Sequence, residues 1–172
     1  NGDPQTGVAI QKMARKLDTG DILVQRTTAI GPKETSEDLL ARLPTLGASC
    51  LIEAVRLVES GRQAFVPQDE TQATYAAKIE RGDSKIDWTV PAQRILNQIR
   101  ALRPWPVAEG ILGTEPLKVF EAELAAAPPG TTPGQITTDQ KREFLVTCGD
   151  GRALSLTQIQ LPNRKRLGAI QF

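Results

Sequence analysis

The string Leu17-Asp18-Thr19-Gly20-Asp21 places two carboxylates three positions apart on either side of a glycine. Carboxylates in this arrangement can orient or polarise a catalytic base, contribute to a metal site, or accept backbone hydrogen bonds in a tight turn. Loops carried by a rigid sheet often hold catalytic groups. The spacing predicts either a functional loop or a structural turn, and both interpretations stay open on the residue types alone.

The 172-residue chain contains no histidine. Ser-His-Asp and Cys-His relays, an imidazole general base and a His-ligated zinc site are therefore excluded for this chain alone. Cys50 and Cys148 form no CxxC pair, so we predict two buried, reduced thiols. Because neither histidine nor further clustered acids accompany Asp18 and Asp21, we predict no metal site.

The composition is typical of a globular protein, with 40% hydrophobic and 24% charged residues in a length that allows one compact domain or two small ones. The net charge of +1 excludes bulk attraction to nucleic acid, so any basic surface must be local. The sequence has no run of about 18 apolar residues for a membrane span. Its first residues lack the layout of a signal peptide. We expect a cytoplasmic protein that does not associate with membranes.

The Asp18 loop is predicted to join two strands. β-branched residues are frequent in 6–13 and 21–30, as in strands, and turn residues lie between these segments. Thr35 and Asp38 are then placed as the capping box of a helix, in which Pro44 and Gly47 predict a kink or a split. Apolar residues recur at helical spacing along it, at Leu39, Leu43, Leu46, Cys50, Ala54 and Leu57.

Two strands and one helix bury too little surface to be stable alone. We therefore predict that residues 1–63 are the C-terminal part of a larger α/β domain. The polar stretch that follows, opened by Pro67, predicts a linker over residues 64–82.

Residues 83–172 are predicted to form a small β domain. A short amphipathic helix is expected after Pro91, ending near Pro104. Strands are then predicted at 117–122, 135–138, 143–148 and 153–161, and several short strands separated by Pro and Gly turns indicate a small barrel. Trp88 and Trp105 are interpreted as packing residues rather than as platforms for base stacking.

Eight short strings carry a resemblance that runs along nearly the whole chain. They are Gly2-Asp3 with Thr6-Gly7-Val8, Leu17 to Leu23, Gly47-Ala48, Thr74-Tyr75-Ala76 with Lys78-Ile79, Ile86-Asp87-Trp88, Ile99-Arg100-Ala101 with Pro104-Trp105-Pro106, Pro133-Gly134, and Gly149-Asp150-Gly151. In order and spacing, the chain resembles the methionyl-tRNA formyltransferases, within the formyltransferase superfamily.

The resemblance implies an α/β plus β fold, in which the trailing part of a Rossmann-like formyltransferase domain is followed by a C-terminal OB-like β-barrel. It also implies an enzyme that moves a formyl group from 10-formyltetrahydrofolate to the α-amino group of methionine on initiator tRNA, without a metal. The family's catalytic trio is an asparagine, a histidine and an aspartate. The aspartate matches Asp18, which would orient and polarise the histidine.

The other two members of the trio belong to an NxHxSLLP pattern, which the resemblance places before residue 1. We therefore expect the 172-residue chain to be inactive by itself. The resemblance also places the pterin of the formyl donor against a loop of Ala14, Arg15, Lys16, Leu17 and Asp18. The family usually has an acid and a glycine where this chain has Ala14 to Lys16, but backbone groups can meet a pterin whatever the side chains.

Seven basic residues are predicted to contact the initiator tRNA. Each alone is typical of a solvated surface, whereas together they could line one side of a barrel against the RNA backbone. They are Lys78, Arg81, Lys85, Arg94, Arg164, Lys165 and Arg166. We expect a monomer with no obligate protein partner.

Two alternatives stay open. The first is a relative that formylates an amino sugar nucleotide or processes formyltetrahydrofolate, because such enzymes share the aspartate loop and a similar barrel. The second is a non-catalytic barrel module that binds tRNA and no folate. Upstream sequence and competition between acceptors would separate them.

Overall fold

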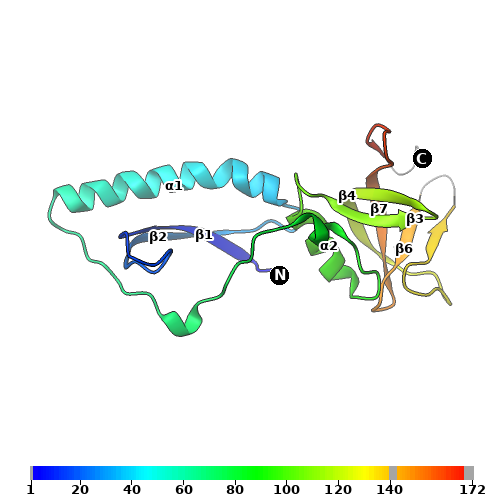
Figure 1. Cartoon of the computed structure of the whole chain (residues 1–172), viewed down its shortest axis with the longest axis horizontal. Helices are drawn as coiled ribbons and strands as arrows, with labels where there is room; N and C mark the ends of the chain where they lie inside the picture. The colour runs from blue at the N-terminus through cyan, green and yellow to red at the C-terminus, as the bar shows by residue number, and fades with distance from the viewer. Residues whose placement is uncertain (1, 140–142, 169–172) are drawn as a thin grey trace. The chain divides into compact units, whose positions relative to one another are not determined.

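The computed structural model describes residues 2–139 and 143–168, which fold into two compact units. One unit comprises Asp3–Lys78, and the other contains the chain from Ile79 onward (Figure 1). The boundaries predicted from the sequence, after residues 63 and 82, stay predictions. The division between the two units falls within the predicted linker, between Lys78 and Ile79.

The N-terminal unit is a two-stranded sheet covered by one helix (Figure 1). Strands β1 (Gln5–Gln11) and β2 (Ile22–Ala29) pair antiparallel, with a register shift next to the loop that joins them. Helix α1 (Ser36–Glu59) packs on both strands. In the described part of this unit, the buried core consists of Val24, Cys50 and Ala54.

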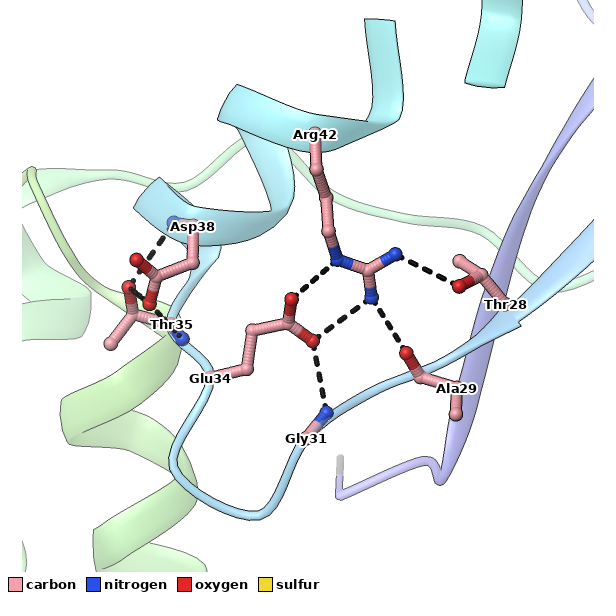
Figure 2. A network of polar contacts seen from close by, with 7 residues as sticks. All are labelled: Thr28, Ala29, Gly31, Glu34, Thr35, Asp38 and Arg42. Carbon is pink, nitrogen blue, oxygen red and sulfur yellow. Dashed lines mark hydrogen bonds and ion pairs between the residues drawn. The ribbon is translucent and has the colours of Figure 1, made fainter. Parts of the chain in front are cut away.

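Helix α1 begins at the predicted capping box. The backbone N–H of Asp38 donates to the Thr35 hydroxyl at 3.3 Å, and the Thr35 N–H donates to the Asp38 carboxylate at 2.9 Å (Figure 2). The predicted split is wrong, because α1 continues through Pro44 for 24 residues. A proline inside a helix removes one backbone hydrogen bond. The other hydrogen bonds of this 24-residue helix keep the turns before and after Pro44 helical.

A second side of α1, next to the face that packs on the sheet, is apolar and exposed. It carries Leu40, Leu51, Ile52, Val55 and Val58, each about half exposed or more. Most of these residues recur at spacings of three, four or seven, and so they lie along one face of the helix. The helix is therefore apolar on two sides, of which the two-stranded sheet covers one.

The C-terminal unit is a curled antiparallel sheet with one helix against it (Figure 1). A 3-10 turn, η2 (Arg81–Ser84), and helix α2 (Ala92–Ala101) precede the strands. The strands are β3 (Ala108–Leu112), β4 (Glu115–Ala126), β5 (Ile136–Thr138), β6 (Phe144–Thr147), β7 (Arg152–Gln160) and β8 (Leu167–Gly168).

The strands pair in the order β3-β4-β7-β6-β5, and β8 pairs with the end of β7. The four strands expected from the sequence are present, with β4 and β7 forming the longest ladder. Strands β3 and β8 were not predicted, because β3 directly follows a proline-rich turn and β8 has two residues. The sheet supports a small C-terminal β domain, whereas closure into an OB-like barrel stays a prediction.

A substantial core lies between α2 and the sheet. Ala92, Ile95 and Ile99 of α2 are buried against residues of β4 and β7, within a cluster of thirteen buried residues. Trp88 packs against this cluster, as predicted. The interpretation of Trp105 as a core residue is wrong, since it is 55% exposed. None of the described helices is long and apolar enough to span a membrane.

Candidate functional site

The loop between β1 and β2 presents Asp18 at the surface. Asp18 has a φ of 57°, and its carboxylate accepts a hydrogen bond from Nε2 of Gln11 at 3.4 Å. A β-carbon on Gly20 would lie 1.7 Å from the carbonyl oxygen of Lys12, so this position accommodates glycine alone. The Lys12 N–H donates to the Asp21 carbonyl at 2.9 Å and closes the base of the loop. The loop is thus both a tight turn and a carrier of an exposed carboxylate.

Gln68 holds the same loop from a distant part of the chain. Its Nε2 lies 2.9 Å from the Asp18 carbonyl oxygen, 2.7 Å from the Gly20 carbonyl oxygen and 3.0 Å from Oε1 of Gln11. The backbones of Ile22 and Val66 exchange two hydrogen bonds of 2.8 Å, which anchors this segment beside β2. This role of Gln68 was not predicted, because no local pattern links residues 48 to 50 positions apart.

The residues predicted to meet the pterin lie together on this loop. Ala14, Arg15, Lys16 and Leu17 are all exposed, and Leu17 is 92% exposed. The Thr19 hydroxyl donates to the Lys16 carbonyl at 3.1 Å and stabilises the turn between them. The loop therefore offers a carboxylate and accessible main chain on one surface.

A second polar network fixes the far end of β2 (Figure 2). The Arg42 guanidinium on α1 donates to the Thr28 hydroxyl at 2.8 Å, to the Ala29 carbonyl at 2.6 Å and to both oxygens of Glu34. The Gly31 N–H also donates to Glu34, at 2.9 Å. The hydrogen bond from Arg42, followed by that from Gly31, lowers the pKa of Glu34, and Glu34 in turn raises the pKa of Arg42. This network ties α1 to the sheet that carries the Asp18 loop.

The seven predicted RNA contacts do not form one cluster. Lys78 and Arg81 are exposed. Lys85 and Arg94 line a groove of about 770 Å³ along α2. Arg164 and Lys165 line a different groove, of about 610 Å³, beside the end of β7. The two grooves have no lining residue in common.

Arg166 is engaged within the protein. Its guanidinium donates to Oε1 of Glu121 at 3.2 Å and lies 4.3 Å from the ring centre of Phe120. Arg103 donates to the same Glu121 oxygen at 3.1 Å. The ion pair and the cation–π contact hold the turn before β8 on β4. Arg166 thus differs from its neighbours Arg164 and Lys165, which line a groove.

Both cysteines are buried and free, as predicted. Burial raises the pKa of the Cys148 thiol to about 11, so it is protonated at neutral pH. Within residues 2–139 and 143–168, no group of three or more histidine, cysteine, aspartate or glutamate side chains is placed to hold a metal ion.

Two family models match the chain, one for each unit. The model described as "Formyl transferase" matches residues 1–55, and the model described as "Formyl transferase, C-terminal domain" matches residues 78–172. Solved structures support the fold. An N-formyltransferase from Helicobacter canadensis, in complex with folinic acid and dTDP-3-aminofucose, matches 93% of this chain and 57% of its own at a TM-score of 0.71 and 18% identity.

HypX from Aquifex aeolicus, in complex with tetrahydrofolic acid, matches 99% of this chain and 30% of its own, with a TM-score of 0.68 and 19% identity. Curated sequence relatives are more similar. A methionyl-tRNA formyltransferase from Anaeromyxobacter dehalogenans is 44% identical over 99% of this chain, and one from Staphylococcus aureus is 36% identical over 100%.

The chain spans about half the length of these curated relatives, 55% in each case. The resemblance seen in the eight short strings thus extends to both units and to identities of 36–44%. With the C-terminal model covering more than half of the residues, the chain belongs to the formyl transferase family.

Proposed function

We propose that this chain is part of a methionyl-tRNA formyltransferase, which transfers the formyl group of 10-formyltetrahydrofolate to the α-amino group of methionyl initiator tRNA. The observation that carries the proposal is the identity of 36–44% across both units to enzymes of that name. We propose that the catalytic centre includes the exposed carboxylate of Asp18, which lies on a loop held by Gln68.

In the proposed reaction, the amine attacks the formyl carbon and an oxyanion develops on the formyl oxygen. The intermediate then collapses as the bond between the formyl carbon and N10 of the donor breaks, so that tetrahydrofolate leaves and takes up the proton that the amine loses. Asp18 supplies the carboxylate that orients a histidine and stabilises its positive charge. The histidine and the asparagine would come from the rest of the catalytic domain, since this chain contains no histidine. Gln11 and Gln68 keep Asp18 in place through its carboxylate and its carbonyl. We expect the isolated 172-residue chain not to catalyse transfer.

The formyl donor fits the exposed side of the same loop. Ala14 to Leu17 are accessible, and main-chain hydrogen bonding to a pterin does not depend on their side chains. Two structural neighbours were solved with a folate bound, which supports a folate donor for this family member. We propose that the C-terminal unit is an OB-like domain that binds the tRNA, and that the enzyme acts in the cytoplasm as a monomer.

The test compares acceptors in the complete protein that contains this chain. We expect formyl transfer to methionyl initiator tRNA, and we expect Asp18→Asn to lower the turnover by at least about a hundredfold with an unchanged melting temperature. Asp21→Asn is the matched control in the same loop and should retain most activity. Full turnover by Asp18→Asn would remove Asp18 from the catalytic centre.

An amino sugar nucleotide is the second candidate acceptor. It is favoured by the fold similarity to the Helicobacter canadensis enzyme, whose structure contains dTDP-3-aminofucose. Transfer to such a nucleotide, with no transfer to methionyl-tRNA, would replace the first proposal. Binding of tRNA without any folate binding or transfer by the complete protein would instead indicate a non-catalytic RNA-binding protein.

A further inference from the structure

The groove along α2 has the composition of a phosphate-binding surface. Its lining includes two exposed cations, Lys85 and Arg94, and the amide side chains of Gln93, Asn97 and Gln98. In the described ranges, neither cation lies within salt-bridge distance of a carboxylate. Their charges are therefore available to an anion that enters the groove.

Hydrogen bonds hold the walls of this groove at a fixed separation. Nε2 of Gln98 on α2 donates to the Asp83 carbonyl at 2.8 Å and to the Lys85 carbonyl at 3.0 Å. The Ile86 N–H donates to the Glu109 carbonyl at 2.9 Å, which ties the same segment to β3. The backbones that carry Lys85 and Arg94 are thus fixed before a ligand binds, which lowers the entropy cost of binding.

Asn97 lines the same groove, and both ends of its amide are engaged within the protein. Its Oδ1 accepts from Nε2 of Gln93 at 3.0 Å and from Nη2 of Arg100 at 2.7 Å. The Nδ2 group of Asn97 lies close to Gly2, since a β-carbon on Gly2 would lie 2.4 Å from it. The groove's preference for an anion such as a phosphate oxygen therefore rests on its two cations, Lys85 and Arg94.

One carboxylate opposes this positive charge. Oδ1 of Asp87 accepts from the Thr89 hydroxyl at 2.6 Å and from the Thr89 N–H at 2.9 Å. These bonds, and more weakly the charge of Arg94, lower the pKa of Asp87, so it stays ionised at neutral pH. Two cations and one carboxylate leave a single net positive charge, which favours modest and salt-sensitive binding.

The lining also indicates which part of a nucleic acid would bind. Val90, Pro91 and Ala101 are its apolar members, and its described residues include no aromatic side chain on which a base could stack. Trp88 is turned away, beside Gly110 and Gly134 and against the core. Such a groove can bind sugar-phosphate backbone but has little means of reading base identity.

We propose that the α2 groove binds a phosphodiester segment of the acceptor tRNA, with Lys85 and Arg94 as its two phosphate contacts and Asp87 as a charge that weakens the binding. This inference rests on the proposed function, because it takes the acceptor to be an RNA. Arg166 is not one of these phosphate contacts. Its role is structural, since Glu121 and Phe120 hold that side chain within the protein.

The experiment measures the Kd of the 172-residue chain for an initiator tRNA transcript at several salt concentrations. Lys85→Gln and Arg94→Gln should each weaken binding several-fold and lower the slope of log K against log salt by about 0.7–0.9. Asp87→Asn keeps the acceptor for Thr89 and removes the charge, so it should tighten binding. A variant that tightens binding cannot owe its effect to unfolding.

Lys118→Gln is the matched control, because Lys118 is an exposed lysine of β4 that lines neither groove. Its affinity and salt slope should equal those of the unchanged chain. If tRNA binds but the substitutions at Lys85, Arg94 and Asp87 have no effect, the groove assignment is overturned and the proposed acceptor stands. If the unchanged chain and the complete protein both fail to bind tRNA, the proposed acceptor fails and this inference fails with it.

Discussion

The two units of the chain differ in how much of their apolar surface they bury themselves. The described part of the C-terminal unit encloses thirteen buried residues between α2 and the sheet, whereas the N-terminal unit buries Val24, Cys50 and Ala54. The N-terminal unit also leaves Leu40 and Leu51 of α1 exposed. Because burial of apolar surface is the main favourable contribution to folding, the C-terminal unit should be stable alone and the N-terminal unit marginal.

The two units also differ in what fixes the position of their candidate sites. In the C-terminal unit, none of the residues that line the α2 groove is among the thirteen buried residues of the core. In the N-terminal unit, polar contacts of Gln68 and Arg42 hold the Asp18 loop and its sheet in place of a large core. Polar contacts of exposed groups contribute less free energy than burial, so the catalytic candidate lies on the weaker unit.

The largest expected effect compares two leucines. Leu154 is fully buried in β7, and Leu154→Ala should destabilise the C-terminal unit by about 2–5 kcal/mol through the lost contacts and the cavity left behind. Leu40 on α1 is 66% exposed, so Leu40→Ala in the same chain should change stability by less than about 0.5 kcal/mol. Denaturant unfolding followed by circular dichroism measures both. Equal losses would contradict the contrast between the units.

The second prediction uses the cysteines as one buried probe in each unit. Cys50 lies in the small N-terminal core and Cys148 in the large C-terminal core. We expect a thiol reagent to label Cys50 at least about tenfold faster than Cys148 in mild denaturant, since local opening requires less free energy in the weaker unit. Mass spectrometry of labelled peptides gives both rates. Cys148 labelled first would reverse the order of stability.

A smaller effect is expected at Arg42, whose guanidinium joins α1 to the end of β2. Arg42→Ala should speed the labelling of Cys50 and leave the labelling of Cys148 unchanged, because both hydrogen-bonded elements belong to the N-terminal unit. Arg56→Ala, an exposed arginine of the same helix, is the control and should change neither rate. Equal effects of the two substitutions would indicate loss of helix propensity or charge rather than loss of the network.

The smallest expected effect is a change in how the stability of the N-terminal unit depends on pH. The pKa of Glu34 is lowered in the folded protein by Arg42 and by the Gly31 N–H, so its contribution to stability is present above the ordinary glutamate pKa of about 4.3. The contribution is lost as the pH falls through the lowered pKa. The free energy of unfolding of the N-terminal unit should therefore fall below about pH 4.3, and less so in Glu34→Gln, in denaturant unfolding followed by circular dichroism at each pH. If the stability of Glu34→Gln falls with pH in the same way as that of the unchanged chain, other carboxylates determine the pH dependence.

Local patterns in the sequence predicted much of the fold. The capping box of α1, the two strands around Asp18 and the four longer C-terminal strands depend on neighbouring residues, and the structure contains all of them. The prediction failed where a long element tolerates a local breaker, as α1 does at Pro44. It also failed at Trp105, where flanking prolines gave no information on burial.

The candidate site was predictable in part. Asp18 and its loop stand out in the sequence, and the structure places them at the surface between two strands. Gln68 could not be found in this way, because its partners lie about 50 positions away and amide side chains carry no distinctive spacing. The basic residues were predicted as one group, yet their separation into two grooves and an internal ion pair depends on where β7, β8 and α2 lie.

The anchoring of the Asp18 loop by Gln68 bears on where the chain can be cut. A boundary placed after residue 63, as composition suggests, would remove Val66 and Gln68 and with them the two hydrogen bonds to Ile22 and the amide that holds the loop. A cut beyond Gln68 leaves these contacts within one fragment. Protein engineers who exchange N-terminal units among relatives should therefore keep residues 64–68 with the N-terminal unit.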